Sequence, residues 1–156
     1  MLKVTDDNYD YYKRVFQTLW TFQANLMGVD QNVDHSPIKV LNAMENESMT
    51  IAKQGLKAGL NDMITMSIHL SYDMKQEISA QLLAKGLPSF NQLADTIKGT
   101  IQKVLNQGKI KTLDDYYIVK EFIIDQGSDI SKADRYRLDK LLSDFEIRSD
   151  KNKNAS

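Results

Sequence analysis

Apolar residues recur every three or four positions through most of this 156-residue chain, and no stretch alternates apolar with polar residues as a half-buried strand does. In the first 27 residues this spacing places Tyr12, Val15, Leu19, Phe22 and Leu26 on one face of a helix. A chain with such spacing buries its apolar stripes by packing helix against helix. The sequence therefore predicts an all-α fold.

Small polar residues, glycine and proline predict where the first helices begin and end. Thr5 is the expected N-cap of the first helix, and Gly28 its stop. A Ser-Pro pair at 36–37 predicts the start of a second helix, because proline at the first helical position gives up no hydrogen bond. The apolar spacing then continues to about Ile64, which predicts one long helix.

Two glycines, Gly55 and Gly59, lie one turn apart inside this second helix. Each costs about 1 kcal/mol of helix propensity, so we expect them to permit close approach of another helix. A further helix, with a break near Ser71, is expected to end at Gly86, before Pro88.

The chain after Gly86 predicts three more helices. Gly108 and Gly127 are the expected stops, Thr112 is a cap, and Ser131 with Asp134 has the spacing of a capping box. We predict a single bundle-like domain of about six helices over 1–147, with possible lobes at 1–86 and 87–147 and a disordered tail at 148–156.

Composition narrows the classes of function. The net charge of −1 gives no overall field that would steer the protein towards nucleic acid or anionic lipid. The chain has no cysteine, no apolar run long enough to span a membrane and no export signal at its start. These features predict a cytoplasmic protein.

The sequence carries no signature of catalysis or of cofactor binding. A Gly-x-Ser-x-Gly turn, a P-loop and a Gly-x-Gly-x-x-Gly loop are all missing from it. His69 and Asp73 lie one helical turn apart, but a catalytic zinc requires three protein ligands and no second pair is evident. We expect no enzyme activity, no metal and no cofactor.

A nucleic-acid-binding regulator is the alternative hypothesis. A short glycine-containing turn at 127–130 separates two predicted helices, as in a helix-turn-helix. The second helix would present Lys132, Arg135 and Arg137, although acids interrupt this basic run. A structural or phage-derived interaction protein is a third possibility.

Acids and tyrosines cluster in the segment Asp-Asp-Tyr-Tyr at 114–117. The acids suit the positive end of a helix, and Tyr116 falls on its apolar face. Asp114, Glu121 and Asp125 share the polar face, with Tyr117 towards its edge. An acidic and aromatic edge of this kind can serve a protein partner.

Similar residues flank the first helix, where Tyr9 and Trp20 fall at the margin of the apolar face near two acids. Tyr136 falls roughly opposite the apolar face of the last helix, so burial within this chain does not easily explain it. The candidate partner-binding residues are Asp6, Tyr9, Asp10, Trp20, Asp114, Asp115, Tyr117 and Tyr136.

Residues 86–146 resemble the carboxyl-terminal part of small bacterial immunity proteins that accompany contact-dependent growth-inhibition and related polymorphic toxins. The shared features are the Gly-Lys-Ile-Lys turn at 108–111, the acidic-tyrosine helix start at 114–117 and Leu-Leu-x-x-Phe-Glu at 141–146. The resemblance implies a cytosolic protein that binds one cognate toxin, encoded immediately upstream, and blocks its active site or activation. Immunity proteins share no functional motif, so the resemblance assigns no residue a role.

Overall fold

Seven α-helices make up most of the described chain, which in the computed structural model comprises residues 2–124 and 130–154. No strand occurs within those two stretches, so the all-α prediction is confirmed with one helix more than expected. None of the described helices combines the length and the apolar content needed to cross a membrane. The helices are α1 (Tyr9–Met27), α2 (Pro37–Glu47), α3 (Met49–Ile68), α4 (Tyr72–Ala84), α5 (Phe90–Gln107), α6 (Leu113–Ile124) and α7 (Lys132–Asn154).

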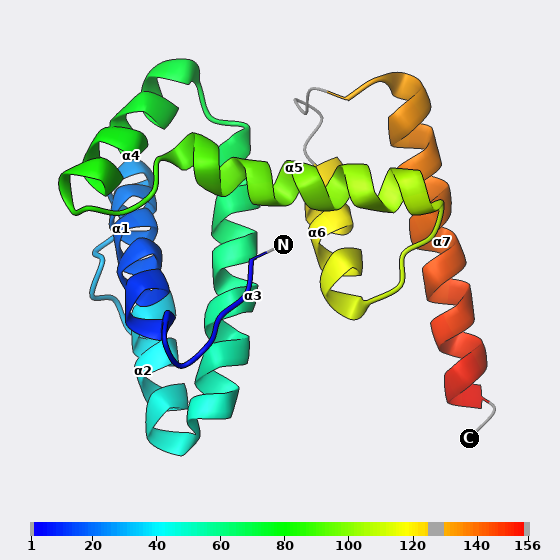
Figure 1. The fold of residues 1–156 in the computed structure, drawn as a ribbon. Coiled ribbons are helices and arrows are strands. Elements are labelled where there is room, and N and C mark those ends of the chain that lie inside the picture. Colours follow the sequence, from blue (N-terminus) through cyan, green and yellow to red (C-terminus); the bar gives the residue numbers. More distant parts are fainter. Residues whose placement is uncertain (1, 125–129, 155–156) are drawn as a thin grey trace.

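The third helix, α3, lies at the centre of the arrangement. It contacts α1 and α2 on one side and α5 and α6 on the other (Figure 1). In the same view α5 runs across the molecule, from the group formed by α1 to α4 towards α6 and α7. Buried apolar side chains from all seven helices belong to one hydrophobic cluster. The pairing of α3 with α6 brings together residues that are more than 50 positions apart in the sequence.

A break at Ser48 divides the long helix that the sequence predicts from residue 37. The Ser48 backbone is extended, with φ −165° and ψ 132°. Its N–H donates to the Met44 carbonyl at 2.9 Å and ends α2, while its hydroxyl accepts from the Ile51 N–H at 3.5 Å and starts α3. The prediction of one helix is therefore wrong. The apolar spacing continues across the break, so spacing alone could not show it.

Two glycines of α3 allow neighbouring helices to come close, as predicted. A Cβ added at Gly59 would lie 2.9 Å from Cε2 of Phe16 in α1. A Cβ added at Gly55 would collide with the Sδ atom of Met44 in α2. The helix-propensity cost of these glycines is thus offset by the packing of α3 against both partners.

Other helix ends follow the predicted signals closely, with one exception. Gly28 and Gly108 take left-handed backbone angles, with φ of 69° and 65°, directly after α1 and α5. The Ser71 hydroxyl accepts from the Met74 N–H at 3.3 Å and starts α4. Thr5, however, is not the N-cap of α1. Its N–H donates to the Asn8 side chain at 2.7 Å, and the helix begins one turn later.

The last helix extends to Asn154, so the prediction of a disordered tail is wrong for residues 148–154. Arg148 explains part of this extension, because its Nη2 donates to the Ile110 carbonyl at 3.0 Å. Its guanidinium also lies over the Phe145 ring, 5.6 Å from the centroid. The hydrogen bond ties the second half of α7 to the turn that follows α5, and the ring contact lies within α7 itself.

Candidate functional site

Two aromatic residues expected on the surface, Tyr9 and Trp20, are buried. They are 4% and 8% exposed, respectively. The Tyr9 hydroxyl donates to Glu45 Oε2 at 2.9 Å, and the Trp20 Nε1–H donates to the Gln31 carbonyl at 2.9 Å. Both rings pack inside the protein, so the expected position at an exposed margin is wrong. A role of either residue in partner binding stays a prediction. A helical wheel of α1 alone could not show that α2 and the loop after Gly28 cover its margins.

The Tyr9 hydroxyl belongs to a satisfied polar group, the tyrosine cluster, formed with Lys13 and Glu45. Lys13 Nζ donates to both Glu45 oxygens, at 2.7 and 2.9 Å. Burial, and then the hydrogen bond to Glu45, hold the pKa of Tyr9 well above its usual range. Burial alone would raise the pKa of Glu45, but the hydrogen bonds from Lys13 and Tyr9 outweigh it and lower that pKa. The tyrosine cluster holds α1 against α2.

The acids at the start of the chain, Asp6 and Asp10, are exposed. Asp6 pairs with Lys53 of α3 at 2.8 Å, with its own side chain 82% exposed. An exposed pair of this kind contributes little to stability. Because Tyr9 and Trp20 are buried, these two acids do not form an acidic and aromatic edge with them.

The Asp-Asp-Tyr-Tyr segment divides into an inner and an outer pair. Asp115 is 1% exposed, and its Oδ2 lies 2.9 Å from Lys103 Nζ. Tyr116 is also buried, as predicted, and its hydroxyl donates to Glu146 at 2.6 Å. Asp114 and Tyr117 are exposed. Asp115 therefore lies inside the protein beside Lys103, and its predicted part in a binding surface is not supported by its position.

The outer pair lines an acidic groove between α3 and α6. On α6, Asp114, Tyr117 and Glu121 recur at spacings of three and four, so they lie along one face. Ala58, Asn61 and Asp62 of α3 face them. The groove has a volume of about 370 Å³. The residues of this acidic groove are Ala58, Asn61, Asp62, Asp114, Tyr117, Ile118 and Glu121.

The carboxylates of the acidic groove are incompletely balanced by cations. Asp114 pairs with Lys57 at 2.7 Å. Partial burial, and then the neighbouring charge of Glu121, raise the pKa of Asp62. No cation of the described residues pairs with Asp62 or Glu121 within 4.0 Å, so this end of the groove is an acceptor for a positively charged donor.

Sequence reasoning placed Asp114, Tyr117 and Glu121 on one face but missed Asn61 and Asp62 across the groove. Asn61 is only 7% exposed, which is unusual for an amide side chain. The available signal was this polar pair within the otherwise apolar stretch from Leu60 to Ile64. That signal does not reveal which helix faces the pair. Asp125, predicted on the same face of α6, lies outside the described residues.

The remaining predicted binding residue, Tyr136, is 73% exposed on α7. It does not line the acidic groove, whose walls come from α3 and α6. Its exposure agrees with the predicted outward placement, and no contact in the described structure assigns it a role.

The cations of the helix-turn-helix hypothesis contact helix ends. Arg135 Nη1 donates to the Ile123 carbonyl at 2.6 Å, and Arg137 Nη2 donates to the Leu105 carbonyl at 2.9 Å. The guanidinium groups thus hold α7 to the last turns of α6 and α5. Lys132 is exposed. Residues 127–129 of the predicted turn lie outside the described residues, so the helix-turn-helix hypothesis stays a prediction.

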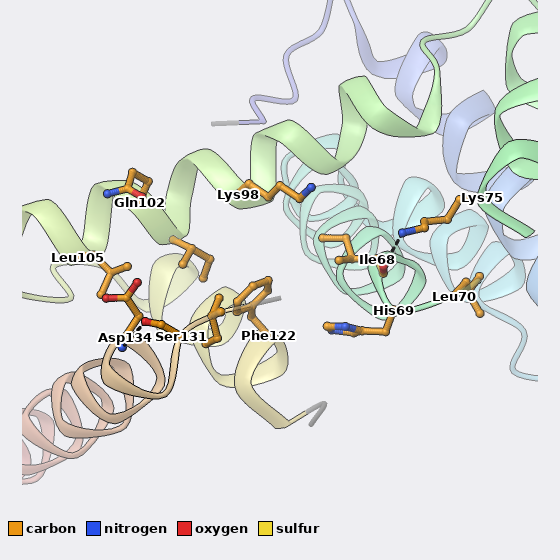
Figure 2. A pocket seen from close by; sticks show the side chains of 12 residues that line it. Ile68, His69, Leu70, Lys75, Lys98, Gln102, Leu105, Phe122, Ser131 and Asp134 are labelled. Carbon is orange, nitrogen blue, oxygen red and sulfur yellow. Dashed lines mark hydrogen bonds between the residues drawn. The ribbon is translucent and has the colours of Figure 1, made fainter. Parts of the chain in front are cut away.

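A larger hollow, about 580 Å³, lies between the end of α3, the start of α4 and helices α5, α6 and α7 (Figure 2). Its polar contacts belong to helix ends. Lys75 Nζ donates to the Ile68 carbonyl at 3.2 Å, and the Ser131 hydroxyl accepts from the Asp134 N–H at 3.1 Å. These contacts hold the ends of helices.

His69, which the sequence placed one turn before Asp73, lines this hollow with its ring directed towards Phe122 (Figure 2). The two ring centroids are 6.1 Å apart. Asp73 is exposed and does not line the hollow. In the part of the chain that the structure describes, no three His, Asp or Glu side chains gather as a metal site.

Comparisons of this chain with protein-family models, with curated protein sequences and with solved structures found no match.

Proposed function

We propose that this chain is a cytosolic immunity protein that binds a cognate bacterial toxin and blocks its active site or activation surface. Binding is by occlusion and uses no catalytic residue or cofactor of this chain. The partner is the product of the gene immediately upstream, and the contact surface is centred on the acidic groove.

The observation that carries this proposal is the outward acidic and aromatic edge of α6. Tyr117 is 52% exposed beside the carboxylates of Asp114 and Glu121. Exposed tyrosines are common anchors of protein interfaces, because they bury a large area at a small cost in side-chain entropy. Clustered carboxylates complement basic surfaces such as those around nuclease active sites.

The sequence resemblance supports the same region. It covers residues 86–146 and includes the acidic-tyrosine start of α6. Asp114 and Tyr117, which the resemblance contains, form one wall of the acidic groove. The near-neutral net charge of −1 requires that any charge complementarity be local, as it is in this groove.

The proposal is tested by co-expressing this chain with the product of the upstream gene. We expect a stable complex and rescue of growth from the toxin. The double variant Asp114→Lys with Tyr117→Ala should bind at least about thirtyfold more weakly, which is the scale of an interface hot spot. Affinity should also fall as salt rises, because exposed charges are screened.

The fold offers a matched control on α4. Tyr72 is 72% exposed and Asp73 is its exposed neighbour in the first turn of a helix. The variant Tyr72→Ala with Asp73→Lys makes the same chemical changes away from the groove and should leave affinity unchanged. Equal losses in both variants would point to general charge effects. A housekeeping gene upstream, with no complex formed, would sink the proposal.

A further inference from the structure

The end of the acidic groove at Asn61, Asp62 and Glu121 has the features of a receptor for one arginine side chain. We infer that the partner inserts an arginine here, with its guanidinium held by the two carboxylates and the Asn61 amide. This inference rests on the proposed function, because it names the chemistry by which the partner recognises the same groove.

The two carboxylates provide charge without a counter-charge. Asp62 from α3 and Glu121 from α6 line the same groove. Partial burial, and then the charge of Glu121, raise the pKa of Asp62. Neither has an ion pair among the residues that the structure describes. The contrast with Asp114 is direct, since Asp114 has Lys57 at 2.7 Å. A cation bound between Asp62 and Glu121 would relieve their repulsion.

Asn61 provides an independent observation that points to a ligand. Its side chain is more than nine-tenths buried, at 7% exposure, and what remains exposed opens into the groove. None of the described residues hydrogen-bonds to its amide group, although its backbone carbonyl accepts from the Thr65 hydroxyl. Its amide atoms are not among the buried side-chain atoms that lack a partner, so they keep some solvent exposure on the groove side. A guanidinium carries five N–H donors in a planar fork, so one group can donate to both carboxylates and to the Asn61 amide oxygen.

The shape of the groove favours arginine over lysine or a bare metal ion. Its volume of about 370 Å³ greatly exceeds that of an ion, and Ala58 and Ile118 provide apolar walls for an aliphatic stem. Tyr117 at the rim offers a ring face on which a planar guanidinium can stack. Arginine also forms paired hydrogen bonds with carboxylates, which the ammonium of lysine cannot do.

The experiment uses the free protein and two small probes, Nα-acetyl-arginine amide and Nα-acetyl-lysine amide. Each is titrated into the full chain while the side-chain amide resonances of Asn61 are followed by NMR. We expect saturable shifts with the arginine probe at millimolar concentrations and binding about tenfold or more weaker with the lysine probe. Equal responses to the two probes, or an unmoved Asn61 signal, would overturn the inference.

Two variants complete the test. Asp62→Asn removes one carboxylate while relieving repulsion, so it should fold normally and bind the arginine probe about tenfold or more weakly. Asp95→Asn alters an exposed acid of α5 outside the groove and should leave binding unchanged. Unaltered binding in Asp62→Asn would contradict the inference.

The two proposals can fail separately. Arginine-probe binding without a toxin complex would overturn the proposed function and leave the arginine site standing. A toxin complex whose affinity is unchanged by Asp62→Asn, together with no response to the arginine probe, would overturn the arginine site alone.

Discussion

The tyrosine cluster of α1 and α2 and the acidic groove of α3 and α6 are built from the same kinds of residue but reach opposite states. In the tyrosine cluster, Tyr9 is buried, and Glu45 accepts a hydrogen bond from the Tyr9 hydroxyl and forms an ion pair with Lys13. In the acidic groove, Tyr117 is exposed and Glu121 faces another acid, Asp62.

The difference comes from the residue that the neighbouring helix supplies. Lys13 reaches across from α1 to neutralise Glu45 of α2, whereas α3 places Asp62 opposite Glu121. A carboxylate that pairs with a cationic side chain of the same protein stabilises the fold. Two neighbouring carboxylates without such a partner can bind a cation from another molecule. Acid-and-tyrosine sequences therefore indicate a binding surface only where the facing helix leaves them unbalanced.

The largest test of this contrast lies within α6, at Asp115. Asp115→Lys would place a second ammonium beside Lys103 at a site that is 1% exposed. We expect a loss of about 3 kcal/mol or more in the free energy of unfolding, because the variant forces a charged side chain into a buried site beside a like charge, although Lys103 itself is 40% exposed. Urea unfolding followed by circular dichroism measures this loss.

Asp114→Lys is the control, one residue earlier. Its partner Lys57 belongs to a pair in which the Asp114 side chain is 53% exposed, so we expect a loss below about 1 kcal/mol. If both reversals cost the same, the division of this segment into an inner and an outer pair is wrong.

A second test removes the cation that distinguishes the tyrosine cluster. Lys13→Met leaves Glu45 with one hydrogen bond where its side chain is 23% exposed. We expect a loss of about 1–3 kcal/mol, the scale for a polar group left without its charged partner. Lys57→Met, the control on α3, should cost less than about 1 kcal/mol. A negligible effect of Lys13→Met would mean that Glu45 needs no built-in cation.

The local signals in the sequence predicted helix ends well. Gly28 and Gly108 were readable because a left-handed residue after a helix favours glycine whatever surrounds it. Only the residues that α6 contributes to the acidic groove could be predicted from the sequence. Asp114, Tyr117 and Glu121 share one helix face, so their spacing places them together.

The other half of the groove depends on contacts between distant segments. Asn61 and Asp62 lie more than 50 positions before Asp114, and no local pattern indicates that α3 faces α6. The burial of Tyr9 and Trp20 has the same origin, because residues outside α1 cover them. A helical wheel shows which face of one helix is most apolar. Whether the residues at the edge of that face are buried depends on the segments that pack against it.

A third test compares the two tyrosine hydroxyls. Tyr9→Phe removes the hydrogen bond to Glu45, which should cost about 1 kcal/mol because the site is buried. Tyr117→Phe changes an exposed side chain and should stay within about 0.5 kcal/mol. Guanidinium chloride unfolding of both variants gives the comparison. A larger loss in Tyr117→Phe would reverse the assignment of the two tyrosines.

The smallest test uses pH, because the two regions should respond with opposite signs. The pKa of Glu45 is lowered from 4.5, so its contribution to stability is complete above that value and disappears as pH falls through the lower folded pKa. The pKa of Asp62 is raised from 3.8, so its ionisation costs stability at neutral pH. That cost is recovered as pH falls through the raised pKa towards 3.8.

Asp62→Asn should therefore be slightly more stable than the wild type at pH 7, by a few tenths of a kcal/mol at this partly exposed position, and the advantage should vanish below the ordinary pKa of aspartate. Glu45→Gln should show the reverse, with a deficit at pH 7 that shrinks as the solution is acidified. Unfolding free energies measured across this range for both variants decide the matter. If Asp62→Asn were destabilising at pH 7, Asp62 would already form an ion pair with a cation of this chain. The carboxylates of the acidic groove would then be neutralised internally, as Glu45 is in the tyrosine cluster.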